Sequence, residues 1–415
     1  MATGKVIVSH PTGNANVAAV VSALHEDELL AAFCTCVMWR PDGSLARLVP
    51  GRLRAIFERR ARIQLPTELV RTRPFRELVR NFVVRAGQKH LVTRETNYFS
   101  IDQIYGDLDR YVARSLHKYH SLRAVYAYED GALHQFRKAR QKGIHCIYDL
   151  PIGYWRAGRT LLTEEGELRP AWKGTLKGLA DSQKKLERKD EEIALADTVL
   201  VASNYTRSTL ELFPGEKKKT VVITYGTPRP NPTVREATDK RKPLRVIYVG
   251  SLTQRKGISY LFAAVEGLGS SVALTVIGRK VGNSEALDKA CSTHRWIESL
   301  PHAEILAQMR QHDVLVFPSL FEGFGLVIGE ALSQGVPVIT TPNTGGPDIL
   351  RDGQDGFIVP IRDAEAIAAR LLELHQDREL LRQMSESARE RASQLDWKGY
   401  KDGTIAAVRA TLCGS

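Results

Sequence analysis

The chain has 415 residues, of which 43% are apolar, 7% aromatic and 26% charged. This balance is typical of soluble globular proteins and excludes disordered and fibrous chains. The length predicts two or more domains of about 100–200 residues each. The formal net charge is +12, and residues 52–94 alone carry twelve basic and three acidic side chains, so one segment supplies most of the excess.

The first half of the chain begins with a strand pattern over residues 5–10, a turn over 11–16 and a helical pattern over 17–24. The start, MATGKVIVSH, therefore predicts a strand rather than a signal peptide. Further strand patterns follow at 124–128, 144–148 and 198–202, separated by helical stretches. Strands that alternate with helices indicate a parallel α/β domain. Residues 161–192, rich in Lys and Glu, predict one or two exposed helices.

The second half opens with the same kind of unit. A strand pattern over 244–249 runs into the turn Gly-Ser-Leu-Thr-Gln-Arg-Lys-Gly and a helical pattern over 258–265, and strands are predicted at 272–277, 314–317, 336–340 and 356–359. Four prolines between 226 and 243 oppose both helix and central strand and indicate a linker. We therefore predict two doubly wound, Rossmann-like α/β domains that face a central cleft: residues 1–225 with a basic helical insertion at 52–94, a linker at 226–243, a second domain at 244–390, and a C-terminal helix at 391–415 that can cross back to the first domain.

The cysteines and acidic residues suggest neither a disulfide framework nor a metal site. Five cysteines are scattered along the chain, and Cys34 and Cys36 lie in the apolar stretch FCTCVMW, where we interpret them as core residues. No D-x-D pair follows a strand, and no His/Cys cluster has ligand spacing. No run approaches the roughly 18–20 uncharged apolar residues that a membrane-spanning helix requires.

The most informative segment is residues 317–339, FPSLFEGFGLVIGEALSQGVPVI. It predicts a strand, a loop punctuated by Gly323 and Gly325, a helix from about residue 326 and another strand. Backbone N–H groups at such a helix start are suited to an anion. Glu322 in the loop and Glu330 in the second helical turn can reach one bound molecule, and ionised carboxylates suit a ligand rich in hydroxyls.

The pair Glu322 and Glu330, followed by Gly-Val-Pro-Val-Ile, resembles the E-x7-E motif of the family-4 retaining glycosyltransferases. The Arg255-Lys256-Gly257 turn and the Gly-Gly-Pro-Asp-Ile-Leu stretch from residue 345 are similar to that family as well. The resemblance is strong over roughly residues 244–360 and weak over the first half. It implies the two-domain GT-B fold and a nucleotide-sugar donor.

The resemblance also implies roles for matching positions. Glu322 would contact the donor sugar, Arg255 and Lys256 would hold the diphosphate, and Glu330 would bind the ribose hydroxyls. The remaining donor-binding candidates are Gly323, Phe324, Gly325, Ser251 and Gly13. Fixed cations beside a departing phosphate stabilise its developing charge more than they stabilise the ground state. At Gly13 the family's glycine doublet is reduced to one glycine, so an ordinary turn is the alternative there.

The acceptor side departs further from the family, whose members often carry a histidine after a middle strand of the first domain. Here that place holds Tyr128, Glu129 and Asp130. We expect Glu129, Tyr128 and Asp149 to form the acceptor pocket, because the strands that precede them end at the same edge of the sheet.

These features predict a retaining glycosyltransferase that transfers a sugar from a UDP- or GDP-linked donor to a hydroxyl of a glycan, lipid or small acceptor, in polysaccharide or glycoconjugate synthesis. We expect no cofactor and no metal, because Arg255 and Lys256 can replace a divalent ion. The alternatives are a GT-B sugar-nucleotide epimerase or phosphorylase, and a non-catalytic sugar-nucleotide-binding scaffold.

The basic segment 52–94 has apolar residues at spacings of three and four, as in amphipathic helices. It can dock on an anionic membrane, bind nucleic acid, or pack its apolar stripe on the first domain with arginines in water. No nucleic-acid motif accompanies it, and we expect no nucleic-acid partner. We expect a cytoplasmic protein, with peripheral attachment to the inner face of the membrane as one possibility.

Overall fold

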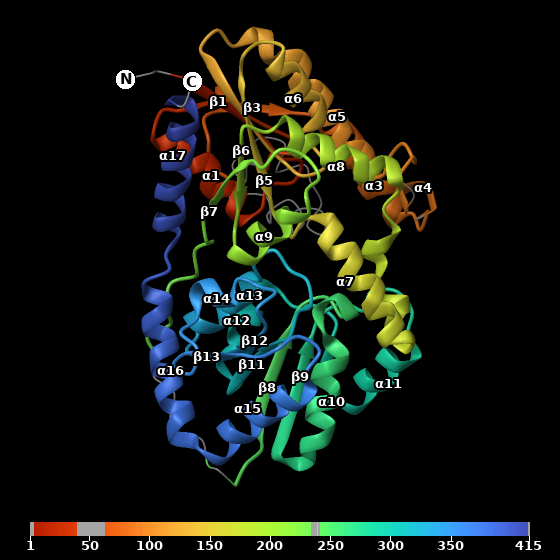
Figure 1. Ribbon diagram of the computed structural model, residues 1–415, viewed down its shortest axis with the longest axis vertical. Coiled ribbons are helices and arrows are strands. Elements are labelled where there is room, and N and C mark those ends of the chain that lie inside the picture. The colour runs from red at the N-terminus through yellow and green to blue at the C-terminus, as the bar shows by residue number, and fades with distance from the viewer. Residues whose placement is uncertain are drawn as a thin grey trace.

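Two parallel sheets, one in each half of the chain, organise the molecule (Figure 1). The computed structural model describes residues 4–39, 63–88, 90–93, 95–233, 239 and 241–413. The first sheet has the order β3-β2-β1-β4-β5-β6-β7, with all neighbouring strands parallel. Its strands are β1 (Lys5–Ser9), β2 (Leu30–Thr35), β3 (Val70–Thr72), β4 (Leu122–Tyr128), β5 (His145–Leu150), β6 (Thr198–Val201) and β7 (Lys219–Val222).

The second sheet has the order β10-β9-β8-β11-β12-β13 and is also parallel throughout. Its strands are β8 (Leu244–Val249), β9 (Val272–Ile277), β10 (Arg295–Ile297), β11 (Val314–Phe317), β12 (Val338–Thr340) and β13 (Gly356–Ile358). In both sheets the chain order reverses beside the first strand of the domain. Ligands of doubly wound folds bind outside the strand carboxyl ends at such a reversal.

Helices cover both faces of each sheet. Those of the first half are α1 (Ala15–Glu26), α3 (Phe75–Arg85), α4 (His90–Thr93), α5 (Ile101–Ser115), α6 (Leu133–Arg140), α7 (Trp155–Leu168), α8 (Gln183–Leu195) and α9 (Asn204–Thr209). Those of the second half are α10 (Ile258–Leu268), α11 (Glu285–Thr293), α12 (His302–Arg310), α13 (Leu326–Ser333), α14 (Gly346–Ile349), α15 (Ala364–Gln376), α16 (Arg378–Ser393) and α17 (Trp397–Cys413). Because helices bury both sheet faces, the central strands are continuous apolar runs such as Val6-Ile7-Val8, all fully buried.

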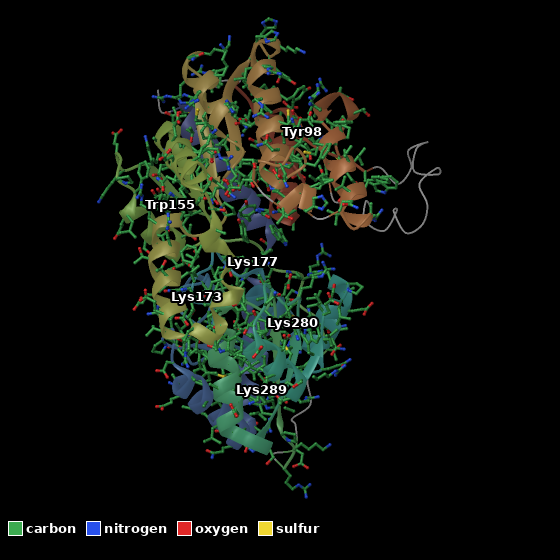
Figure 2. The ribbon with its side chains drawn as sticks, turned by 90° about the vertical axis from the view of Figure 1, so that its right-hand side faces the viewer. Tyr98, Trp155, Lys173, Lys177, Lys280 and Lys289 are labelled. Atoms are coloured by element: carbon green, nitrogen blue, oxygen red, sulfur yellow. The ribbon has the colours of Figure 1, made fainter. Side chains whose placement is uncertain are left out.

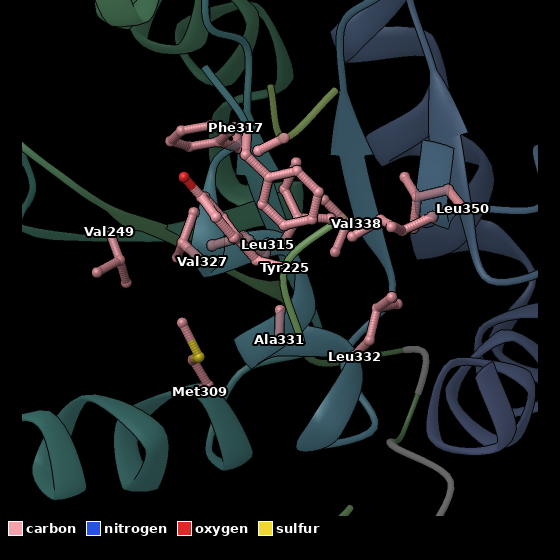
Figure 3. Packing of buried hydrophobic residues seen from close by; sticks show 14 of the residues in the cluster. Tyr225, Val249, Met309, Leu315, Phe317, Val327, Ala331, Leu332, Val338 and Leu350 are labelled. Carbon is pink, nitrogen blue, oxygen red and sulfur yellow. The ribbon is translucent and has the colours of Figure 1, made fainter. Parts of the chain in front are cut away.

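Figure 3 shows the core of the second domain, where Leu315 and Phe317 of β11 lie among Val338 of β12 and Val327 and Ala331 of α13. Tyr225, which precedes the linker, packs into the same cluster, and this cluster also includes Val6 and Val8 of β1, so buried apolar contacts join the two domains at the linker. The cysteines Cys34, Cys36, Cys146 and Cys291 are free and buried, and Cys413 is free and exposed.

Four strands were absent from the sequence prediction: β2, β3, β7 and β10. Three of them have only three or four residues and carry Arg or Lys, as in the Val-Arg-Thr of β3, so alternation cannot identify them. The prediction of exposed helices over residues 161–192 was wrong for α8. That helix buries Leu186, Lys189, Glu192 and Ile193, because it lies beside α6 against the first sheet.

The C-terminal helix α17 returns to the first domain and runs along α1, on the left of Figure 1. Lys401 forms an ion pair with Glu26, and Arg409 forms one with Asp27. Gly226 lies so close to Trp397 that an added Cβ would come within 2.6 Å of its backbone. The linker and the start of α17 therefore cross between the domains side by side.

A third crossing is made by α7 and the 3₁₀ turn η4 (Pro170–Thr175), which belong to the first half in sequence. They extend downward beside the second domain, on the right of Figure 1, and Figure 2 follows this segment from Trp155 to Lys173. Trp172 stacks on Phe262 of α10 with ring centroids 6.0 Å apart. All strands of the first sheet precede residue 226 and all strands of the second sheet follow it, while α7 and η4 pack across this division.

Glu165 of α7 ties this segment to the second domain. Its carboxylate is fully buried and accepts hydrogen bonds from Gln254 (2.7 Å), Tyr260 (2.9 Å) and Arg362 (2.7 Å). Arg362 holds a left-handed backbone conformation (φ 63°) to make this contact. A buried carboxylate with three donors from the other domain makes α7 part of the second domain's structure.

Candidate active site

The loop after β8 carries Arg255 and Lys256 in a short 3₁₀ turn, η7 (Gln254–Lys256), at the start of α10. Gly257 ends the turn with φ 66°, and a Cβ there would lie 1.9 Å from the carbonyl oxygen of Pro318. Only glycine permits this close approach. The turn is further fixed because the Arg255 carbonyl accepts the backbone N–H of Leu320 at 2.9 Å. The β8 and β11 loops therefore form one unit.

The loop after β11 brings Glu322 against both cations. The Glu322 carboxylate contacts Lys256 Nζ and lies 3.4 Å from Arg255 Nη1, which also donates to the Phe321 carbonyl at 2.7 Å. Lys256 Nζ lies 4.7 Å from the centre of the Phe317 ring. Burial and the adjacent Arg255 charge lower the pKa of Lys256, while the Glu322 carboxylate favours its charged form. The cluster therefore brings two basic side chains and one carboxylate together at the carboxyl edge of the second sheet.

Glu330 lies in the second turn of α13, which starts at Gly325 in a left-handed conformation (φ 87°). Its Oε1 is 2.9 Å from Nε2 of His302, the first residue of α12. The Glu330 side chain is 18% exposed, so it is accessible to a ligand. The structure thus pairs Glu330 with a histidine, whereas Glu322 forms its ion pairs with Arg255 and Lys256.

Gly323 and Phe324 contact other parts of the protein. Ser203 and Thr206 of the first domain donate to the Gly323 carbonyl, and a Cβ on Gly323 would meet the Pro151 carbonyl at 1.9 Å. The Phe324 ring is buried against Tyr225, 5.2 Å between centroids, so it belongs to the core. Any ligand contact at this position is left to the backbone.

Ser251 and Gly13 lie in the first loops of their respective domains. The Ser251 carbonyl accepts the hydroxyl of Tyr248 at 2.9 Å. Gly13 has φ 64°, and its N–H donates to Nδ1 of His10 at 2.9 Å. Burial lowers the pKa of His10 to about 4, so this imidazole is neutral and acts as an acceptor. His10 therefore fixes the glycine turn after β1.

The three acceptor-pocket candidates separate in the structure. Asp149 is 4% exposed and accepts the Tyr126 hydroxyl at 2.6 Å, and Tyr128 is 3% exposed with its ring against His10. Both side chains lie in the core, because other parts of the chain cover β4 and β5 at the positions of these two residues. Glu129 lines a cavity in the described part of the chain, and Arg255 of the second domain lines it as well. Burial raises the pKa of Glu129 to about 7.

Sequence reasoning missed four residues around these positions: His10, His302, Trp155 and Lys189. Lys189 lies on α8, where it resembles any lysine of a charged helix, and Trp155 follows Gly153-Tyr154 with no motif of its own. His302 lies after the loop that follows β10, and β10 is one of the strands that the sequence pattern did not predict. Only the pairing of distant loops in space identifies these side chains.

Among the residues that the structure describes, no group of three or more His, Cys, Asp or Glu side chains could hold a metal ion. Within the same residues, no helix combines the length and apolar character needed to cross a bilayer.

Comparison with known proteins assigns the geometry to a class. Residues 231–391 match the family model described as glycosyl transferases group 1. This match covers nearly all of the second domain, including both cations and both glutamates. The second domain therefore resembles the glycosyl transferases of group 1.

Individual relatives match part of the chain. The chain is 29% identical over 181 residues to a glycogen synthase of Mycobacterium tuberculosis (strain ATCC 25618 / H37Rv), covering 41% of this chain and 44% of that protein. It is 32% identical over 166 residues to the capsular polysaccharide biosynthesis glycosyltransferase CapM of Staphylococcus aureus, covering 36% and 43%. The chain thus spans less than half of the length of the relatives it matches.

Solved structures match the whole chain. Sucrose-phosphate synthase from Thermosynechococcus elongatus aligns with a TM-score of 0.68 at 17% identity, covering 99% of this chain and all of that one. HepE of Anabaena, in complex with UDP and glucose, aligns with a TM-score of 0.64 at 16% identity, covering 98% and 100%. Together with the two parallel sheets, these alignments show that the chain has the two-domain α/β GT-B fold.

Proposed function

We propose that the protein is a retaining glycosyltransferase that transfers a sugar from a nucleoside diphosphate to a hydroxyl of a glycan, lipid or small acceptor. The observation that carries this proposal is the convergence of Arg255, Lys256 and Glu322 at the carboxyl edge of the second sheet. Two cations are suited to the diphosphate of the donor, and Glu322 is suited to its sugar.

The chemistry follows from the charges. The bond between the anomeric carbon and the β-phosphate oxygen breaks, and the acceptor oxygen bonds to that carbon from the same face. The hydroxyl proton passes to the departing phosphate. Arg255 and Lys256 stabilise the negative charge that builds on this phosphate, and a partly buried position strengthens the effect. Glu330 would hold the ribose hydroxyls of the donor.

The similarity to CapM supports a role in polysaccharide or glycoconjugate synthesis, and the HepE complex supports a UDP-linked donor. Binding can be tested by thermal shift with UDP, GDP, ADP and dTDP, since a ligand that binds only the folded state raises the melting temperature. A rise with UDP or GDP is expected. No rise with any of the four nucleotides would refute the proposal.

The site assignment predicts two losses of activity. Lys256→Met should lower kcat roughly 100- to 1,000-fold, the usual cost of removing one electrostatic stabiliser of a transition state. Glu330→Gln should mainly raise the KM for the donor. Lys289→Met on exposed α11 and Glu373→Gln on α15 are the matched controls and should leave turnover unchanged. Full activity in both site variants would remove the assignment.

We also propose that turnover needs no metal, because Arg255 and Lys256 supply the positive charge at the diphosphate. Activity in excess EDTA should equal that of the untreated protein. Loss of activity in EDTA with rescue by magnesium or manganese would contradict this.

Peripheral binding to an anionic membrane is the third part of the proposal, and α3 with its neighbours supports it. Phe75 and Phe82 on one side of α3 are 65% and 72% exposed, and Leu78, Leu91 and Tyr98 are exposed beside them. Tyr98 lies at the surface in Figure 2. Part of the basic segment, residues 52–62, 89 and 94, lies outside the described residues. An amphipathic surface in a basic segment is suited to anionic lipid.

Flotation with vesicles tests this surface. The protein should float with vesicles containing phosphatidylglycerol and lose most binding at high salt, since exposed charges are screened. The double variant Phe75→Ser with Phe82→Ser should stay with the soluble fraction and keep its fold, because both rings are exposed. Flotation of neither protein would refute membrane binding.

A further inference from the structure

A cavity of about 210 Å³ lies between the two domains, beside the Arg255–Glu322 cluster. Its first-domain walls come from the start of α7, from the 3₁₀ turn η5 (Lys177–Ala180) and from α8, and the second domain contributes Arg255 and Phe321. At roughly 30 Å³ per water molecule in the liquid, the volume equals about seven waters. That is room for about one six-membered sugar ring.

One wall of this cavity is polar and carries Glu129, Asp181 and Lys189. Lys189 Nζ lies 3.5 Å from Glu129 and 3.4 Å from Asp181, so the ammonium group holds both carboxylates in position. Glu129 and Lys189 side chains are only 9% and 10% exposed. An ionised carboxylate can accept about four hydrogen bonds. Each carboxylate therefore keeps acceptor capacity for a hydroxyl group beyond its contact with Lys189.

The apolar part of the cavity wall includes two aromatic rings, those of Trp155 and Phe321. The Trp155 indole N–H donates to Asp190 at 2.6 Å, so the residue offers the cavity its ring rather than a donor. The Phe321 ring is wedged against Gly153 and Gly158, where an added Cβ would come within 2.7 and 2.9 Å of it. Arg159 and Arg255 also line the cavity, so three basic and two acidic side chains surround a ligand held there. A ligand with hydroxyl groups and one apolar face is suited to this mixed wall, because its hydroxyls can hydrogen-bond to the charged groups while its apolar face packs on the rings.

Arg255 connects the cavity to the donor residues, because it lines the cavity and lies 3.4 Å from Glu322. A ligand held in the cavity is therefore next to the group expected to carry the donor diphosphate. We propose that this cavity binds one pyranose unit of the acceptor, with Glu129 and Asp181 accepting its hydroxyls and Trp155 covering its apolar face. The inference rests on the proposed glycosyltransferase function and names the substrate class of its acceptor site.

The experiment compares acceptors and charge variants. The acceptors are the 4-nitrophenyl α- and β-pyranosides of glucose, galactose and mannose, with nucleotide release as the readout. Glu129→Gln and Asp181→Asn should each lower kcat/KM for the pyranoside at least tenfold, and leave the thermal shift by the nucleotide unchanged. The matched control is Asp102→Asn. Asp102 contacts Lys185 (3.1 Å) of the same charge cluster but does not line the cavity, so kcat/KM should stay within twofold.

Tryptophan fluorescence gives a readout that does not depend on turnover. Titration with the methyl pyranosides of the same three sugars should change the emission of the wild-type protein, and Trp155→Phe should abolish the change. Unaltered kcat/KM in both charge variants, or no fluorescence change with any pyranoside, overturns the inference. If a nucleotide binds and these results are negative, the acceptor site alone fails. If no nucleotide binds, the proposed function fails first.

Discussion

Removal of the Arg362 guanidinium should destabilise the docking of α7 on the second domain. Arg362 Nε donates to the fully buried Glu165 at 2.7 Å, and Nη2 donates to Glu164 at 3.0 Å and to the Leu161 carbonyl at 3.2 Å. Breaking a buried pair by removing one partner costs about 3–5 kcal/mol, because the other charge stays buried. Arg362→Ala should therefore raise the equilibrium constant for local opening of α7 roughly 100- to 5,000-fold.

Hydrogen exchange of the α7 amides, residues 155–168, measures this opening directly. Arg362→Gly refines the test, because Arg362 has φ 63° and glycine adopts that conformation without strain. The glycine variant should lose the same contacts but retain about 1 kcal/mol more stability than the alanine variant. Arg382→Ala removes a surface pair with Glu379 and should cost about 0–1 kcal/mol. If the α7 amides of Arg362→Ala exchange at the wild-type rate, the conclusion that the Arg362–Glu165 contact holds α7 on the second domain is refuted.

Two further predictions concern the domain contact and pH. Phe321→Ala should lower the free energy of unfolding by about 3–5 kcal/mol, because the Phe321 ring is 4% exposed and packs between Gly153 and Gly158. Calorimetry measures this loss as a lower melting temperature, and an unchanged melting temperature would contradict the packing. Burial raises the pKa of Asp149 to about 7 and of Glu192 to about 8, so the folded protein keeps protons that the unfolded chain releases above about pH 4. Stability should therefore fall as pH rises from 5 to 8, by about 3 kcal/mol for Asp149 alone, and a melting temperature that rises over this range would contradict the sign.

The sequence by itself determined the two-sheet architecture and identified most of the candidate donor-site residues. Long apolar runs such as residues 244–249 identify buried parallel strands, because helices cover both sheet faces. Gly257 and Gly325 identify loops whose backbone conformation or close contacts exclude a side chain, and the functional candidates Arg255, Lys256 and Glu322 lie in those same loops. Local patterns are sufficient there because a loop and its neighbouring strand and helix are continuous in the chain.

The tertiary structure alone decided which acidic residues of the first domain face a cavity. Glu129 and Asp149 each follow a strand predicted from the sequence and look equivalent there. In the structure, Asp149 lies within β5 and contacts Tyr126, while Glu129 follows β4, contacts Lys189 of α8 and lines the cavity shared with the second domain. The same holds for α7, which belongs to one half in sequence and packs on the other through Glu165. Burial and pairing at these positions depend on contacts between residues far apart in the chain, and no local pattern of residue types encodes them.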